Sequence, residues 1–111
     1  MSHVEEAALL RVYMGESDRE DGHPLHEAVV LAARGAGLAG ATVLRGALGF
    51  GRSSRLHSAK ILRLSDDLPL VVEIVDRPDR IEGFLDRLTA LVGERGLITL
   101  EMVRVVKAGL V

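Results

Sequence analysis

The residues best suited to hold a charged ligand lie together between positions 45 and 55. Three arginines, three glycines and two serines occur there: Arg45, Gly46, Gly49, Gly51, Arg52, Ser53, Ser54 and Arg55. Glycines let successive backbone N–H groups turn toward an anion, while hydroxyl and guanidinium groups donate hydrogen bonds to phosphate or carboxylate. The segment therefore predicts an anion-binding loop, although the same composition is also typical of a flexible turn.

Two familiar phosphate motifs do not account for the glycines. Residues 35–40 match G-x-G-x-x-G, but a helix is expected before them and a strand after them. A phosphate site needs the opposite order, with a helix N-terminus aimed at the ligand. Residues 46–55 contain neither Gly-Lys-Ser nor Gly-Lys-Thr, so they do not form a P-loop. We expect residues 35–40 to end a helix.

The sequence contains only incomplete matches to catalytic and metal-binding motifs. Ser53, Ser54 and His57 include a nucleophile and a base, but the nucleophile-elbow pattern is missing and no third residue is placed beside them. The histidines are scattered along the chain: His3, His23, His26 and His57. The acidic stretch 16–21 lacks the spacing of a calcium loop. The sequence therefore predicts no catalytic residue and no metal site.

Length and composition indicate one soluble domain, residues 1–111. The hydrophobic share is 48%, yet charged residues interrupt every apolar stretch before it could span a membrane. Glu5 and Glu6 stand where a secretory signal would carry basic residues, and the chain has no cysteine, so we expect a cytoplasmic protein. The net charge of −2 and the few aromatic residues argue against nucleic-acid binding.

The first half of the chain predicts a strand, a helix and a second strand. Hydrophobic residues alternate over residues 8–14, as in a strand. Pro24 is expected at the first helical position, and Gly37 can take the left-handed conformation that ends a helix. Apolar residues between them follow helical spacing: Leu25, Ala28, Val29, Ala32 and Ala36. A strand is expected over about 41–47, followed by an exposed loop over 48–68.

The second half repeats this order. Within the loop, residues 60–64 are a candidate short strand and residues 65–67 a turn. Residues 70–75 predict a central strand, and a helix should begin near 76–78 and stop at Gly93 and Gly96. Its apolar stripe is continuous: Ile81, Phe84, Leu85, Leu88, Leu91 and Val92. A last strand over 97–106 completes an α+β ferredoxin-like βαββαβ sandwich, an antiparallel sheet with two helices on one face.

The sheet face away from the helices should be largely apolar. Six of its expected residues are Leu9, Tyr13, Val71, Val75, Val103 and Val105. Charged residues interrupt this face at Arg11, Glu73 and Glu101. Because a large apolar face is unfavourable in water, and because symmetric homo-oligomers are common, we expect self-association through it.

Three segments of the chain resemble the uncharacterised family known as domain of unknown function 190. They are LRVYMGESD at residues 10–18, LAGATVLRGALGFG at 38–51 and LPLVVEIVD at 68–76. The resemblance covers nearly the whole chain and implies a relative of the nitrogen-regulatory P-II signalling proteins. Those are ferredoxin-like homotrimers that bind adenine nucleotides in clefts between subunits. A long loop after their second strand responds to the ligand and docks on a target, often a membrane transporter.

The same resemblance assigns residues to the site. The responsive loop corresponds to residues 46–68, and its base, residues 45–51, would border the nucleotide cleft. Residues 93–96 are shorter and less glycine-rich than the P-II phosphate loop, so a mononucleotide or diphosphate held by residues 52–55 is an alternative to a triphosphate. Glu16 and Asp18, after the first strand, are candidates for reading a ribose or a base edge.

Together these observations favour a non-enzymatic, homotrimeric sensor of AMP, ADP or ATP that signals through the loop after the second strand. One alternative is a small enzyme in which Arg52 and Arg55 hold a phosphorylated substrate and His57 exchanges a proton. Another is an oligomeric adaptor that binds no ligand. The sequence does not identify the regulated partner.

Overall fold

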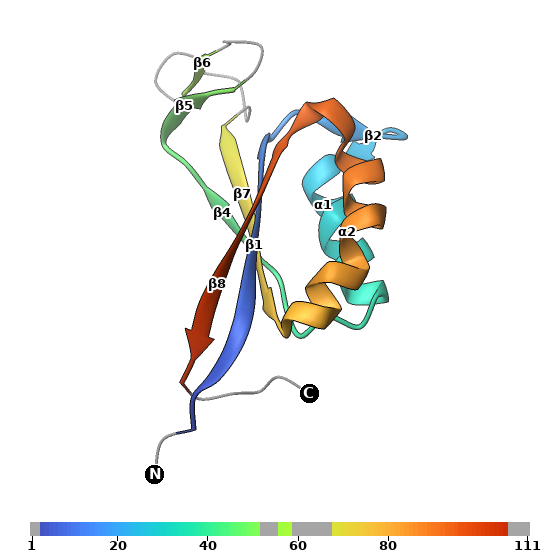
Figure 1. Ribbon diagram of the computed structural model, residues 1–111. Helices are drawn as coiled ribbons and strands as arrows, with labels where there is room; N and C mark the ends of the chain where they lie inside the picture. Colours follow the sequence, from blue (N-terminus) through green and yellow to red (C-terminus); the bar gives the residue numbers. More distant parts are fainter. Residues whose placement is uncertain (1–2, 52–55, 59–67, 107–111) are drawn as a thin grey trace.

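Two βαβ halves make up the chain (Figure 1). The computed structural model describes residues 3–51, 56–58 and 68–106. The first half contains β1 (Glu5–Gly15), α1 (Leu25–Gly35) and β4 (Thr42–Arg45). The second half contains β7 (Pro69–Asp76), α2 (Pro78–Val92) and β8 (Leu97–Val105). This order confirms the predicted ferredoxin-like α+β fold.

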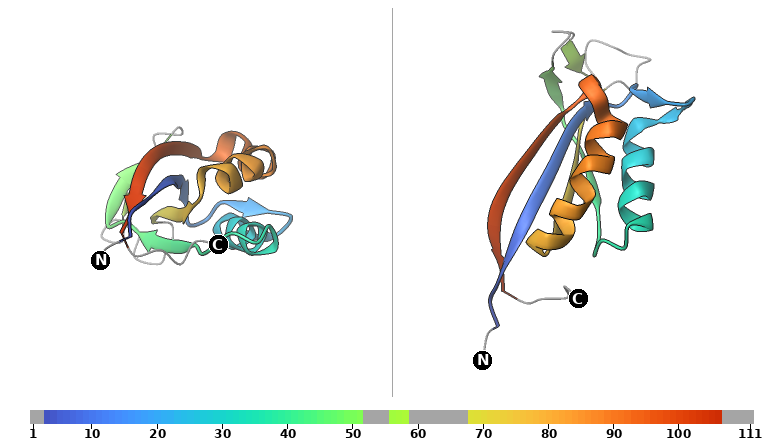
Figure 2. Two further views of the ribbon diagram at one scale, coloured as in Figure 1. Left: turned by 60° about the horizontal axis from the view of Figure 1, so that its bottom comes forward. Right: turned by 45° about the vertical axis from the view of Figure 1, so that its right-hand side comes forward.

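The four long strands form one antiparallel sheet in the order β4-β7-β1-β8. Strand β1 pairs with β7 on one side and with β8 on the other, and β4 pairs with β7. Both helices cover the same face of this sheet, as the views in Figure 2 show. The prediction of residues 70–75 as an inner strand is therefore confirmed.

Five short elements join the long ones. Strands β2 (Arg19–Glu20) and β3 (His23–Pro24) form a small hairpin before α1. Strands β5 (Leu48–Phe50) and β6 (Leu56–Ser58) form a second two-stranded sheet. The 3-10 turn η1 (Gly93–Arg95) follows α2. Leu48 and Phe50 are exposed, as expected of the loop predicted over 48–68, but the pairing of β5 with β6 was not predicted. The candidate strand at residues 60–64 lies outside the described ranges.

The core lies between the sheet and the helices. Alternate residues of β1 and β7 point into it because successive side chains of a strand face opposite sides. The strands bury Leu10, Val12, Met14, Leu70, Val72 and Ile74. The helices bury Leu25, Val29, Ala32, Ala33, Ile81, Phe84, Leu88 and Val92. Each large apolar side chain removed from water contributes about 1.5 to 3 kcal/mol, so this layer accounts for the packing of the two halves.

The structure differs from the predicted ends of three elements: the start of α1, the extent of β4 and the end of α2. Pro24 precedes α1 instead of opening it, because its backbone is extended (φ −57°, ψ 131°) and pairs with Arg19 in the β2–β3 hairpin. Strand β4 covers only part of the predicted 41–47. Gly37 follows α1 with a φ of 78°, as predicted, and Gly93 follows α2 with a φ of 57°. Gly96 is extended and leads into β8.

Within the described residues, no helix lies on the other face of the sheet (Figure 2). That outer face carries Leu9, Val71, Val75 and Val103, which are half-buried, and Tyr13, which is exposed. Neither helix in the described ranges combines the length and the apolar character needed to cross a bilayer.

Candidate functional site

The predicted binding residues that the structure describes gather at one end of the sheet, at the top of Figure 1. Strands β1 and β4 both run antiparallel to β7, so their last residues meet beside the start of β7. Glu16 follows β1 and donates its backbone N–H to the carbonyl oxygen of Leu68 at 2.8 Å. Arg45 is the last residue of β4. We call the region formed by Glu16, Arg45, Gly46 and Pro69 the loop end.

An ion pair joins Glu16 to Arg45 across the loop end. The guanidinium Nη2 of Arg45 donates to Oε2 of Glu16. The Glu16 side chain is only 13% exposed, whereas that of Arg45 is 58% exposed. The second carboxylate oxygen of Glu16, Oε1, is buried and has no hydrogen-bond partner among the described residues. The pair therefore presents an accessible cation next to an unused acceptor.

Asp18 stabilises the turn after β1. Its Oδ2 accepts a hydrogen bond from the Gly15 N–H at 2.9 Å, and its backbone N–H donates to the Gly15 carbonyl at 3.1 Å. Its carbonyl oxygen accepts from the N–H of Leu25 at 2.8 Å, which ties the turn to the start of α1. Asp18 thus has a structural role at this end, and its predicted contact with a ribose or base stays a prediction.

The glycines of the loop end differ from the expectation of free N–H groups. Gly46 donates its N–H to the carbonyl oxygen of Pro69 at 2.7 Å, so this group extends the pairing of β4 with β7. A Cβ at position 46 would lie 2.9 Å from Cγ of Pro69, and one at 49 would lie 3.4 Å from it. Gly51 has open space around it. Close packing on Pro69 therefore gives Gly46 a structural role, whereas anion binding by these glycines stays a prediction.

Residues 52–55, which carry the predicted arginine and serine donors, lie outside the described residues. The backbone of His57 is described, in β6, where it pairs with Gly49 of β5. The hairpin of β5 and β6 thus begins three residues beyond Arg45.

Arg95 is a residue of this end that motif analysis missed. It donates to Oε1 of Glu20 at 2.6 Å, to the carbonyl oxygen of Leu91 at 2.5 Å and to the carbonyl oxygen of Arg19. These contacts fasten the β2–β3 hairpin to the end of α2. The only sequence signal was an arginine between two glycines, which says nothing of a hairpin some 75 residues away.

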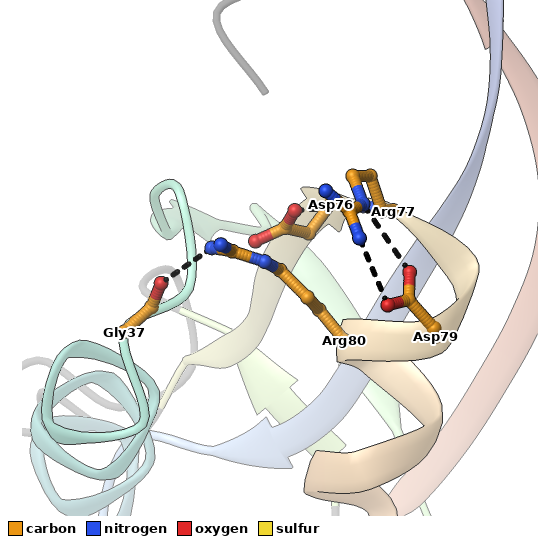
Figure 3. A network of polar contacts seen from close by, with 5 residues as sticks. All are labelled: Gly37, Asp76, Arg77, Asp79 and Arg80. Carbon is orange, nitrogen blue, oxygen red and sulfur yellow. Dashed lines mark hydrogen bonds and ion pairs between the residues drawn. The ribbon is translucent and has the colours of Figure 1, made fainter. Parts of the chain in front are cut away.

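A second polar cluster lies at the start of α2, and Figure 3 shows its members. Arg77 donates two hydrogen bonds to Asp79, at 3.3 and 3.0 Å, which lowers the pKa of Asp79 and raises that of Arg77. Arg80 donates to the carbonyl oxygen of Gly37 at 3.1 Å. The adjacent cavity of about 350 Å³ is lined in part by Asp79, Arg80 and Phe84. Because its charged groups already have partners, this cluster fastens α2 to the α1–β4 connection.

The arrangement at the loop end suits a ligand with two kinds of polar group. The exposed guanidinium of Arg45 can bind an anion, and Oε1 of Glu16 can accept a hydrogen bond from a hydroxyl or amine once the contacts that bury it change. Among the described residues, no three His, Asp or Glu side chains come close enough to hold a metal ion.

Comparison with known families gives a match over nearly the whole chain. The DUF190 family, described as an uncharacterized ACR, matches residues 7–105. A UPF0166 protein of Aquifex aeolicus is 37% identical over 98 residues, covering 88% of this chain and 91% of the relative. A UPF0166 protein of Methanocaldococcus jannaschii is 32% identical over 92 residues, covering 83% and 84%.

Solved structures share the fold at low sequence identity. CPII of Thiomonas intermedia, a nitrogen regulatory PII-like protein bound to ADP, AMP and bicarbonate, superposes with a TM-score of 0.73. It is 12% identical to this chain, with 95% of this chain and 92% of CPII covered. A putative PII-like signalling protein of Thermus thermophilus has a TM-score of 0.59 at 15% identity, with 92% and 89% covered. The ferredoxin-like sheet and helices described above are thus those of a PII-like fold.

Proposed function

The chain belongs to the DUF190 family, and we propose that it is a PII-like regulatory protein of the cytoplasm. In this proposal it binds an adenine nucleotide, AMP, ADP or ATP, in clefts between the subunits of a homotrimer. It signals through residues 46–68, the loop that follows β4, to a target protein. Membrane transporters are among the candidate targets.

The observation that carries this proposal is the pairing of Glu16 with Arg45 at the loop end. A nucleotide combines phosphate oxygens with ribose hydroxyls. The exposed cation of Arg45 matches the first group, and the unused Oε1 of Glu16 matches the second. The fold likeness to CPII, whose structures contain ADP and AMP, supports the choice of an adenine nucleotide.

The position of the pair supports a link between ligand and loop. Arg45 lies at the point where the chain leaves the sheet, with only Gly46 and Ala47 before β5. An anion that binds the Arg45 guanidinium shares its positive charge with Glu16, so it weakens the contact that holds the base of the loop. A sensor needs such a difference in contacts between its free and bound states.

The bare outer face of the sheet supports self-association. Its apolar residues span three adjacent strands, β7, β1 and β8, and a second copy would remove them from water. Clefts between subunits form only in such an assembly, so the trimer and the binding site are proposed together.

Two other functions make different predictions. An enzyme acting on a phosphorylated substrate in the same cleft would convert its ligand during incubation. An adaptor without a ligand would assemble in the same way but would gain no stability from nucleotides. Incubation with AMP, ADP and ATP, followed by chromatography of the nucleotides, separates the first alternative from a sensor.

The proposal is tested by native mass spectrometry and thermal unfolding of the purified protein. We expect a trimer that retains adenine nucleotide and a higher melting temperature when AMP, ADP or ATP is added, because a ligand bound only by the folded state stabilises it. Arg45→Ala should remove most of this increase, whereas Arg34→Ala, at the exposed end of α1, should leave it unchanged. A monomer with no response to any of the three nucleotides would refute the proposal.

A further inference from the structure

The cavity of about 350 Å³ between the two helices lies at the end of the domain opposite the loop end (Figure 1). Ala36, Gly37 and Leu38, at the end of α1, form one wall, and residues from the first two turns of α2 form the other. Sites for small molecules have volumes of about 300 to 1,000 Å³, so this cavity has room for a small ligand.

Gly83 keeps the cavity open. It lies within α2, where glycine is less favourable than alanine because it loses more backbone freedom on folding. Gly83 is not among the glycines with a positive φ, and a Cβ at this position would meet nothing within 4 Å. Neither backbone geometry nor close packing on the described residues therefore accounts for it. A glycine that lines a ligand site does account for it, because a larger side chain would occupy the space.

The cavity is lined by one cation and one anion, and no ion pair joins them among the described contacts. Arg80 reaches toward the carbonyl oxygen of Gly37, whereas the carboxylate of Asp79 faces Arg77 (Figure 3). Besides fastening α2, both groups retain capacity for a ligand. The contacts found among the described residues use one of the five N–H donors of Arg80. The side chain of Asp79 is 67% exposed.

The end of α1 adds partial negative charge to the same cavity. The last carbonyl groups of a helix project from its C-terminal end and act together as a negative pole. Ala36, which caps α1, lies in the cavity wall. An ammonium group is therefore favoured between the end of α1 and Asp79, and a carboxylate is favoured beside Arg80.

These charges select the class of ligand. One guanidinium and one carboxylate leave the lining side chains without net charge, so a phosphate or nucleotide would be attracted by Arg80 but repelled by Asp79. A zwitterion satisfies both groups at once. Phe84 and Leu38, which also line the cavity, can contact a small apolar side chain of the ligand.

We propose that this cavity binds a free α-amino acid with a small apolar side chain. Arg80 binds its carboxylate, Asp79 and the end of α1 bind its ammonium group, and Gly83 leaves room for its side chain. The cavity is formed within one chain and lies away from the loop end. The inference therefore depends neither on nucleotide binding nor on the trimer.

L-Valine and two analogues test the inference. Isovalerate lacks the ammonium group of valine and isobutylamine lacks its carboxylate, while both keep the branched apolar group. We expect valine to shift the amide NMR signals of Gly37 and Gly83 in a saturable manner, and each analogue to bind at least tenfold more weakly. Absence of a saturable shift with valine would refute the proposal. Equal binding of either analogue would also refute it, because a single charge would then suffice.

Three variants locate the ligand. Arg80→Met removes the charge and should weaken valine binding at least tenfold, whereas Arg87→Met, at an exposed position of α2, should bind valine like the parent. Gly83→Leu fills the cavity and should abolish binding. It retains Arg80, so it decides the question should Arg80→Met unfold, as verified by circular dichroism. Parent-like binding by folded Gly83→Leu would exclude this cavity. Because these measurements contain no nucleotide, a negative result leaves the proposed function intact.

Discussion

The carboxylate of Asp76 is fully buried and accepts a hydrogen bond from the backbone N–H of Ala39 at 2.8 Å. Its other oxygen accepts from the N–H of Arg77 at 2.7 Å. Asp76 ends β7, and Ala39 lies in the connection between α1 and β4. One side chain thus joins the two βαβ halves at the end of the sheet opposite the loop end.

We expect Asp76→Ala to lower the free energy of unfolding by about 2 to 4 kcal/mol, because it removes an acceptor for two N–H groups beside a buried site. Asp86→Ala, at an exposed position of α2, should change the free energy by less than about 0.5 kcal/mol. Urea unfolding followed by circular dichroism measures both. Equal stability of the two variants would mean that Asp76 does not join the halves.

Replacement of glycine by alanine should change the melting temperature in opposite directions at positions 96 and 83. A Cβ at position 96 would lie 2.6 Å from the carbonyl oxygen of Tyr13, which belongs to the paired backbone of β1 and cannot move aside easily. Gly96→Ala should therefore lower the melting temperature. A Cβ at position 83 would meet nothing within 4 Å, and alanine is preferred over glycine within a helix by about 1 kcal/mol. Gly83→Ala should therefore raise the melting temperature, and the same sign for both variants would contradict this account.

The ion pair of Arg77 with Asp79 predicts a contribution to the pH dependence of stability. Arg77 lowers the pKa of Asp79 below its ordinary value of 3.8. A carboxyl group with a lowered pKa in the folded state stabilises the protein above the pKa of the unfolded chain, and this stabilisation is lost as the pH falls through the folded value. The variant Asp79→Asn should therefore be less stable than the parent at neutral pH, and this difference in stability should shrink as the pH falls below 4. The effect is small because both side chains are largely in water, and a constant difference between pH 7 and pH 3 would count against it.

The sequence predicted the fold where pattern and packing agree. Alternation in β1 and the apolar stripe of α2 identify buried faces, because the period of each pattern matches its element. Gly37 and Gly93 were predictable as helix stops for the same kind of local reason. The hairpin of β5 and β6 was missed because its pattern is only three residues long on each side.

The candidate site was predicted less completely, because it depends on contacts between distant segments. Residue types indicated Glu16 and Arg45 separately, but their pairing follows from β1 and β4 running in the same direction beside β7. The glycine-rich composition suggested free N–H groups at Gly46, yet this N–H is bonded to Pro69. Arg95 could not be assigned from its neighbours, because its partners lie in the β2–β3 hairpin.

The last prediction concerns the unused oxygen of Glu16. If Oε1 accepts a hydrogen bond from a ribose hydroxyl, the parent should bind ADP more tightly than its 2′,3′-dideoxy analogue. A hydrogen bond to a charged group contributes about 1.5 to 3 kcal/mol, which corresponds to about ten- to a hundredfold in affinity. Glu16→Ala should bind the two nucleotides equally, because the acceptor that distinguishes them is gone.

Isothermal titration calorimetry with both nucleotides measures this difference directly. The matched control is Glu82→Ala, at an exposed position on α2, which should keep the preference of the parent for ADP. Arg45→Ala should weaken the binding of both nucleotides to a similar extent, because both carry the phosphate groups. A parent protein that binds ADP and the dideoxy analogue with equal affinity would show that Glu16 does not contact the ribose. In that case its carboxylate serves only as the partner of Arg45, and the unused oxygen has no part in recognition.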